Sequence, residues 1–135
     1  MAVSLNLGIS CLDMLKMKKN NIIQIITNEN KILLEDVLIA DSFYFRFKGL
    51  MGKKTLDKKE GLLIKPCNSI HTFFMKMNID VAFLDNDNIV VAIYKDMRPW
   101  KISKIYTNSN FVIEGNAGSL SELKIGDKIK IVNKA

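Results

Sequence analysis

Short apolar runs rich in isoleucine and valine, separated by polar turns, constrain this chain more than any other feature of its sequence. Side chains branched at Cβ pack well on a pleated surface, so such runs favour strands. The clearest examples are residues 22–26, 32–39, 79–84 and 89–94. Asn, Asp and Glu separate the first two runs and the last two, and Asn and Asp tolerate the left-handed turns of hairpins. The pattern predicts two antiparallel hairpins.

Helical periodicity is short wherever it occurs. Apolar residues recur at helical spacing in 43–50, after the N-cap residues Asp41 and Ser42, and residues 117–123 favour one or two helical turns. Further short strands are expected at residues 61–65, 71–75, 104–107, 111–114 and 128–132. Many short strands with little helix predict a mostly β (α+β) fold, a small closed or partly open β-barrel or sandwich with one or two short helices.

The length of 135 residues suits one domain, and the chain has no internal repeat, low-complexity stretch or linker. Because the strand pattern begins only after Asn21, we expect residues 1–20 to be an N-terminal extension and residues 21–135 to be a single β-rich domain. No segment reaches the ~18 apolar residues of a membrane span, and the N-terminus lacks the basic start of a signal peptide. With only Cys11 and Cys67, the chain suits a reduced cytoplasmic protein, although a single disulfide also fits.

The charge balance is basic, with 20 Lys and Arg against 14 Asp and Glu and a net charge of +6. Such a balance suits nucleic acid, anionic lipid or an acidic ligand. Lysine nevertheless supplies all the cations except Arg46 and Arg98, and arginine is the residue that forks onto phosphates and guanine edges. Nucleic-acid binding is therefore the weakest functional hypothesis, and it would use Trp100 and the lysines at 53, 54, 58 and 59.

Two candidate sites, a phosphate-binding loop and a structural zinc site, do not meet the requirements of their chemistry. Residues 49–53 (GLMGK) look like a phosphate loop, but Lys54 stands where that loop needs Ser or Thr, and Phe47 stands where it needs glycine. One histidine and two cysteines cannot complete a structural zinc site within one chain. We therefore reject nucleotide hydrolysis, and as the first choice we expect no metal and no cofactor.

Asp80 is the polar residue that most needs a physical explanation. Alternation along residues 79–84 places it on the same face as Ala82 and Leu84, so its carboxylate is expected to be buried. A buried charge is costly unless it is paired or hydrogen-bonded. The sequence predicts an ion pair with Arg46 or Lys76, and the alternative is an acid that binds a ligand.

Two functional hypotheses follow, from different classes of protein. The first is a small ligand-binding or protein-interaction module with a polar cleft, whose partner is an anionic small molecule or a protein. Its predicted binding residues are Arg46, His71, Phe74, Lys76, Asp80 and Trp100. The second is an enzyme, hydrolytic or thiol-dependent, with Cys67, His71 and Asp80 as nucleophile, base and orienting acid, or as a hydrolytic metal site. The sequence leaves this choice open and assigns no catalytic residue.

Several short motifs occur in a characteristic order between about residues 38 and 132. They are Arg46 with 49–52 (GLMG), 60–63 (EGLL), 73–76 (FFMK) with 79–85 (IDVAFLD), 99–100 (PW), 112–115 (VIEG) with 117–118 (AG), and 126–127 (GD). In this combination the chain resembles the family called domain of unknown function 192, or uncharacterised protein family 0127. It departs from the family pattern at Lys53, where arginine is common, at Asn78, where proline is usual, and at Glu114-Gly115, which replaces a Leu-Glu-Leu run. The resemblance implies a β-rich single domain and no particular activity or catalytic residue.

Overall fold

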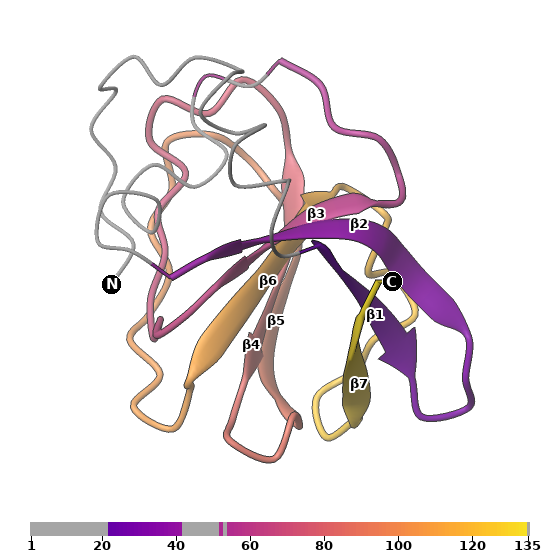
Figure 1. Ribbon diagram of the computed structural model, residues 1–135. Helices are drawn as coiled ribbons and strands as arrows, with labels where there is room; N and C mark the ends of the chain where they lie inside the picture. Colours follow the sequence, from indigo (N-terminus) through magenta and orange to yellow (C-terminus); the bar gives the residue numbers. More distant parts are fainter. Residues whose placement is uncertain (1–21, 42–51, 53, 135) are drawn as a thin grey trace.

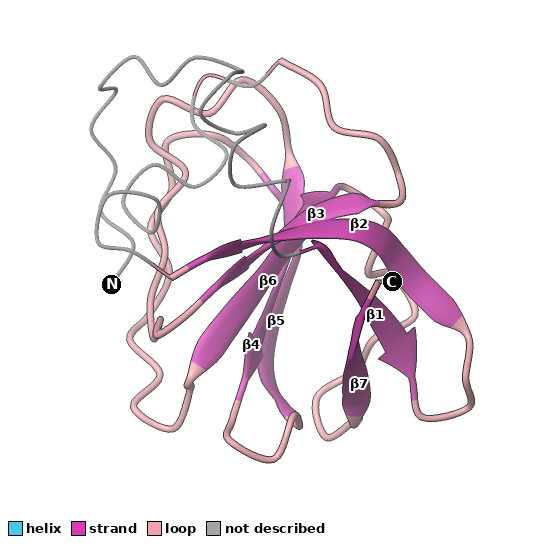
Figure 2. Cartoon of the chain, in the orientation of Figure 1, coloured by secondary structure: helices cyan, strands magenta, loops and turns pink. Residues whose placement is uncertain are grey.

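The computed structural model describes residues 22–41, 52 and 54–134, and their regular structure is one seven-stranded sheet (Figures 1 and 2). The strands are β1 (Ile22–Thr27), β2 (Ile32–Ala40), β3 (Glu60–Ile64), β4 (Ile79–Leu84), β5 (Val90–Met97), β6 (Phe111–Asn116) and β7 (Ile129–Asn133). The mostly β prediction is confirmed, as are the hairpins β1–β2 and β4–β5. The helix predicted after Asp41 lies outside the described residues.

The sheet curls into a half-barrel with strand order β5-β4-β6-β3-β2-β1-β7 (Figure 1). Strands β2 and β3 are parallel, and each other neighbouring pair is antiparallel. The two edges meet at one end, where the Val90 amide donates to the Asp127 carbonyl at 2.8 Å and the Ile129 amide donates to the Asn88 carbonyl at 3.0 Å. Of the predicted alternatives, a closed or partly open barrel or a sandwich, the partly open barrel is the one that agrees with the curled sheet.

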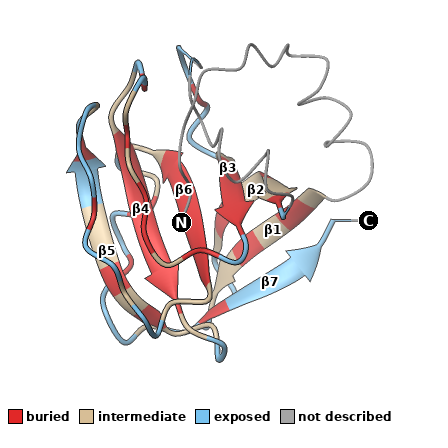
Figure 3. Cartoon of the chain, turned by 90° about the vertical axis from the view of Figure 1, so that its left-hand side faces the viewer, coloured by how far each residue is buried: buried red, intermediate tan, exposed pale blue. Residues whose placement is uncertain are grey.

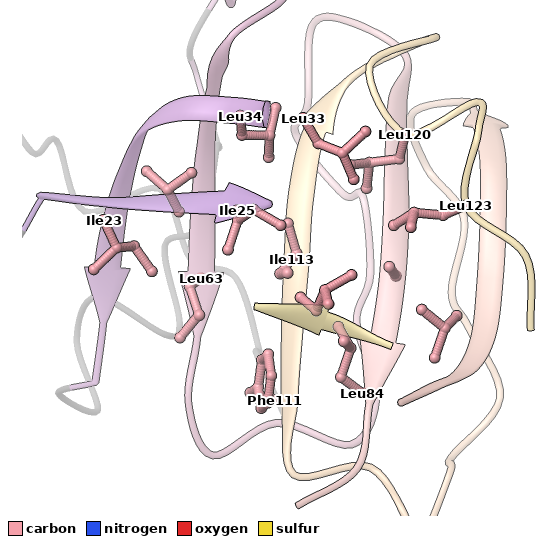
Figure 4. Close-up of a cluster of buried hydrophobic side chains, with 14 residues drawn as sticks. Ile23, Ile25, Leu33, Leu34, Leu63, Leu84, Phe111, Ile113, Leu120 and Leu123 are labelled. Atoms are coloured by element: carbon pink, nitrogen blue, oxygen red, sulfur yellow. The ribbon is translucent and has the colours of Figure 1, made fainter. Parts of the chain in front are cut away.

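Two apolar clusters lie on opposite faces of the sheet. The inner cluster, enclosed by the curl, draws residues from all seven strands and is completed by Leu120 and Leu123 (Figure 4). The outer cluster lies on the other face, where Leu56, Cys67 and Ile70 from the loops pack over the strands. Because β4 and β6 are covered on both sides, they are buried along almost their whole length, whereas β7 is exposed beyond its first residue (Figure 3).

Three segments differ from the predicted elements. Residues 71–75 are not a strand, because only His71 makes an isolated bridge, to Ile102, and the chain then turns. Residues 104–107 are likewise loop and turn. Residues 117–122 form hydrogen-bonded turns instead of a helix, since Gly118 has a left-handed φ of 93° that interrupts helical geometry. Among the described residues, no helix is long and apolar enough to cross a membrane.

A pair of glycines lets other groups approach the inner face of the sheet closely. Gly61 of β3 and Gly115 of β6 are register partners, and Gly115 is also the partner of Asp80 in β4. A Cβ at Gly61 would lie 2.8 Å from the Glu114 carbonyl oxygen and 2.8 Å from a methyl group of Leu34. Glycine at position 61 is therefore required by space, not by an unusual φ.

We predict that Gly61→Ala lowers the free energy of unfolding by about 2–3 kcal/mol, because the new methyl group collides with backbone that cannot rotate away. Gly118→Ala is the control, since its methyl group would meet nothing within 4 Å and only its φ of 93° opposes it. The control should cost about 1 kcal/mol. Urea denaturation measures both variants, and equal losses would contradict the packing explanation.

Candidate functional site

Asp80 is buried on the inner face of β4 and is held by backbone amides. Its Oδ1 accepts a hydrogen bond from the Asp96 amide at 2.9 Å. Its Oδ2 accepts bonds from the amides of Gly118 at 2.9 Å and Leu120 at 3.0 Å. The prediction that Asp80 is buried and hydrogen-bonded is confirmed. Amides with partial positive charge satisfy the carboxylate here, in the manner of an oriented dipole site.

The predicted ion pair with Lys76 is wrong. Lys76 is exposed, and no ion pair joins it to a described residue. Arg46, the other predicted partner, lies outside the described residues.

The hydrogen bond that Asp80 accepts from the Asp96 amide also fixes the backbone at the point where β5 leaves the sheet. The β4–β5 register shifts between Ile79 and Val81, and Asp96 has a left-handed φ of 55°. Asn78 Nδ2 donates to the Asp96 carboxylate at 3.0 Å and supports the same irregularity. Asp80 therefore fixes the start of the loop that carries Trp100, although its own side chain lies on the inner face.

Thr72 joins the loop that carries Trp100 to the loop that follows β3 in the chain and contains residues 71–75. The Thr72 side chain is fully buried, and its Oγ1 donates to the Arg98 carbonyl at 2.6 Å while accepting from the Lys101 amide at 2.9 Å. The Thr72 backbone adds a bond to the Lys101 carbonyl at 2.8 Å and accepts from the Trp100 amide at 3.0 Å. These four bonds hold residues 98–101 against residues 71–75 as one unit.

Two large aromatic side chains project from this unit. Phe74 and Trp100 are 45% and 59% exposed, and their ring centroids lie 4.8 Å apart. Both residues have positive φ, 63° at Phe74 and 65° at Trp100. Bulky residues avoid this region, and each such residue costs on the order of 1–3 kcal/mol. The surrounding hydrogen bonds keep both aromatic residues in a conformation that neither side chain favours.

His71 adjoins the aromatic pair through Phe73. The His71 ring stacks on Phe73 at 4.8 Å, and the Phe73 ring lies 6.0 Å from Trp100. Burial lowers the pKa of His71, and its Nδ1 accepts a hydrogen bond from the Phe73 amide at 3.1 Å. The proton of the neutral ring is therefore on Nε2, which is buried and has no hydrogen-bond partner among the described residues.

The segment after Trp100 is exposed on one side and anchored on the other. The Ser103 amide donates to the Ile70 carbonyl at 2.8 Å, and the Tyr106 hydroxyl lies 2.7 Å from that of Tyr94. Burial, and then the bond to Tyr94, raises the pKa of Tyr106 to about 12. Ile102 and Ile105 nevertheless remain 65% and 66% exposed.

We use the term aromatic–cationic surface for the exposed side chains of these two loops. Its large apolar members come from both loops, and four exposed cations lie between them in sequence. The members are Phe74, Lys76, Arg98, Trp100, Lys101, Ile102, Lys104 and Ile105.

The nucleophile, base and orienting acid proposed for an enzyme are not assembled. Cys67 lies in the outer cluster and its thiol donates to the Ser69 carbonyl at 3.2 Å, whereas the carboxylate of Asp80 is held on the inner face. His71 donates to neither group. Within the described part of the chain, no group of three or more His, Cys, Asp or Glu residues could hold a metal ion. The described residues therefore form neither the proposed arrangement of nucleophile, base and orienting acid nor the proposed metal site.

The structure thus divides the predicted binding residues. It brings His71, Phe74 and Trp100 together, and it leaves Lys76 exposed on the same loop as Phe74. Asp80 supports the site from the inner face. Thr72 was missed, because a threonine inside an apolar run is typical of a strand and its bonds depend on a loop distant in sequence.

Glu114 was also missed, and it is the most unusual ionisable group described. It lies in β6 on the outer face, between Leu62 of β3 and Val81 of β4, and its Oε2 has no hydrogen-bond partner among the described residues. Burial raises the pKa of this carboxyl group to about 8. Glu114 is therefore mostly protonated at neutral pH.

Comparison with known proteins matches residues 17–131 to the family model DUF192, described as Uncharacterized ACR, COG1430. A UPF0127 protein from Pyrococcus horikoshii is 40% identical in an alignment of 114 positions that covers 78% of this chain and 96% of that protein. A UPF0127 protein from Thermococcus sibiricus is 36% identical in an alignment of 108 positions that covers 75% of this chain and 69% of that protein.

A solved structure has the same fold. A protein of unknown function from Novosphingobium aromaticivorans superposes with a TM-score of 0.69, covering 81% of this chain and 83% of its own, at 19% sequence identity. At this low identity the likeness concerns the fold alone.

We predict that Asp80→Asn lowers the free energy of unfolding by about 2–4 kcal/mol, because a neutral amide cannot accept all three backbone bonds and its NH2 group meets donors. Asp85→Asn is the matched control, since Asp85 Oδ1 accepts its two turn amides at 2.9 and 3.0 Å and Asn retains that oxygen. Chemical denaturation compares them. An Asp80→Asn protein as stable as the control would contradict this role.

We predict that Glu114→Gln stabilises the protein at pH 9 by a few kcal/mol and changes little at pH 4. The folded pKa of Glu114 is raised from 4.5 to about 8, so its stability contribution is complete below the unfolded pKa and is lost as pH rises through the folded value. Gln removes that loss. Glu29→Gln, at an exposed turn, is the control. Denaturation across this pH range provides the measurement, and a pH-independent difference would refute the explanation.

Proposed function

The chain belongs to the DUF192 (UPF0127) family, and we propose from its geometry that it is a binding module which engages an anionic partner through the aromatic–cationic surface. Of the binding residues predicted from sequence, His71, Phe74, Lys76 and Trp100 contribute to or adjoin this surface, and Asp80 positions it.

One observation carries the proposal: two exposed aromatic residues in contact, both held at positive φ. Strain of this kind persists only where surrounding structure over-determines it, and it concentrates at functional sites. Here the bonds of Thr72 supply that constraint. A surface that only needed to be soluble would gain stability from a glycine or asparagine at either position.

Charge indicates the sign of the partner. Residues 71–77 and 98–106 contain four cations and no carboxylate. No ion pair joins these cations to another described residue, so their charge is directed to the solvent. The whole chain carries a net charge of +6, which favours encounter with anions in the same way.

Trp100 offers a direct test, because it is the only tryptophan in the chain. We predict that its emission shifts or is quenched on titration with at least one of three anionic probes: poly-L-glutamate, an oligothymidylate, or vesicles containing phosphatidylglycerol. The Lys101→Gln/Lys104→Gln variant should respond more weakly, since both exposed cations lie in the segment directly after the fluorophore. Binding of the oligothymidylate alone would revive the nucleic-acid hypothesis.

The control variant is Lys124→Gln/Lys128→Gln, which removes the same charge from exposed positions beside the contact between β5 and β7. It should respond like the wild type. No response to any probe, or equal weakening of both double variants, would overturn the proposed function.

A further inference from the structure

The apolar side chains of the aromatic–cationic surface are too exposed to be explained by packing within this chain. Ile102 and Ile105 are 65% and 66% exposed, and they lie in the same segment as Trp100, at 59%. Phe74 adds a fourth exposed apolar side chain beside Trp100. Exposed apolar side chains of this size, gathered on two loops, indicate a surface that becomes shielded from water when a partner binds.

The cations on these loops are mostly lysines, which separates two kinds of partner. Lysine is depleted at protein–protein interfaces, where arginine is preferred. Lys76, Lys101 and Lys104 instead combine with Trp, Phe and Ile, the composition of elements that lie in the interface of a membrane. Long lysine side chains keep their charge at the headgroups while their stems and neighbouring apolar groups enter the acyl boundary.

Charge complementarity points the same way. Along residues 98–106 a lysine stands next to each exposed apolar residue: Lys101 adjoins Trp100 and Ile102, and Lys104 adjoins Ile105. No carboxylate interrupts this stretch. A bilayer rich in anionic lipid attracts such a segment along its whole length. The exposed isoleucines, in contrast, have no use on a nucleic acid, whose flat bases stack on aromatic rings.

We propose that the partner of this surface is an anionic lipid bilayer, on which the two loops rest with Phe74, Trp100 and Ile102 inserted at the interface. This inference rests on the proposed function and names the chemistry of its partner. The bonds of Thr72 hold both loops in the inserting arrangement before contact, so little ordering is needed at the membrane.

The experiment uses the full chain with vesicles of phosphatidylcholine, alone or mixed with phosphatidylglycerol. We expect cosedimentation and a blue shift of Trp100 emission with the mixed vesicles, and quenching of that emission by lipids brominated on the acyl chain. Lys101→Gln/Lys104→Gln should weaken partitioning roughly 25-fold at low salt, since each cation near an anionic surface contributes about a fivefold gain.

A pair of isoleucine variants separates the contribution of apolar insertion into the bilayer from that of electrostatic attraction to it. Ile102→Ser should weaken partitioning about tenfold, whereas Ile125→Ser, which changes an isoleucine of matching 67% exposure in the 124–128 turn, should leave it unchanged. Lys124→Gln/Lys128→Gln serves as the charge control. Circular dichroism confirms that each variant is folded.

The outcomes distinguish this inference from the proposed function beneath it. If poly-L-glutamate or the oligothymidylate perturbs Trp100 and the mixed vesicles do not, the lipid inference is overturned and the proposed function stands. If no probe acts, both fail. Vesicle binding that the control variants weaken as much as the surface variants do would also overturn the inference.

Discussion

The carboxylate of Asp80 is the interaction on which the rest of this structure depends. It gathers the amide of Asp96, at the end of β5, and the amides of Gly118 and Leu120, in the turn after β6, at one point on the inner face of β4. The charge in the core is therefore stabilised by dipoles that have no other partner there, and those dipoles are in turn held by the charge.

The same arrangement explains how a buried residue can shape a distant surface. Asp80, on the inner face of the sheet, fixes the irregular end of β5, and Thr72, in a neighbouring loop, fixes the loop that follows β5. Between them, the chain has little freedom over residues 96–101, which include two of the left-handed conformations. Trp100 is thus positioned by backbone bonds more than by contacts of its own ring. Substitution of the ring itself should leave the loop largely intact.

Local patterns in the sequence predicted local structure well. The hairpins follow from β-branched runs around Asn- and Asp-rich turns, and the burial of Asp80 follows from strict alternation with Ala82 and Leu84. The hydrogen-bond donors to Asp80 could not be predicted, because they are backbone amides, which almost every residue type has. The parallel pairing of β2 with β3 and the docking of β7 beside β1 join segments with no shared local signal. Residues 71–75 look like a strand, yet the bonds of Thr72 go to a loop instead.

The carboxyl group of Glu114 takes up a proton when the chain folds near neutral pH. Between pH 4.5 and about 8 the unfolded side chain is mostly ionised, whereas the folded side chain retains its proton in the apolar layer between Leu62 and Val81. Each molecule that folds near neutrality therefore withdraws close to one hydrogen ion from the solvent through this residue. The heat released on folding consequently depends on the ionisation enthalpy of the buffer, and transfer between two buffers of equal pH alters it.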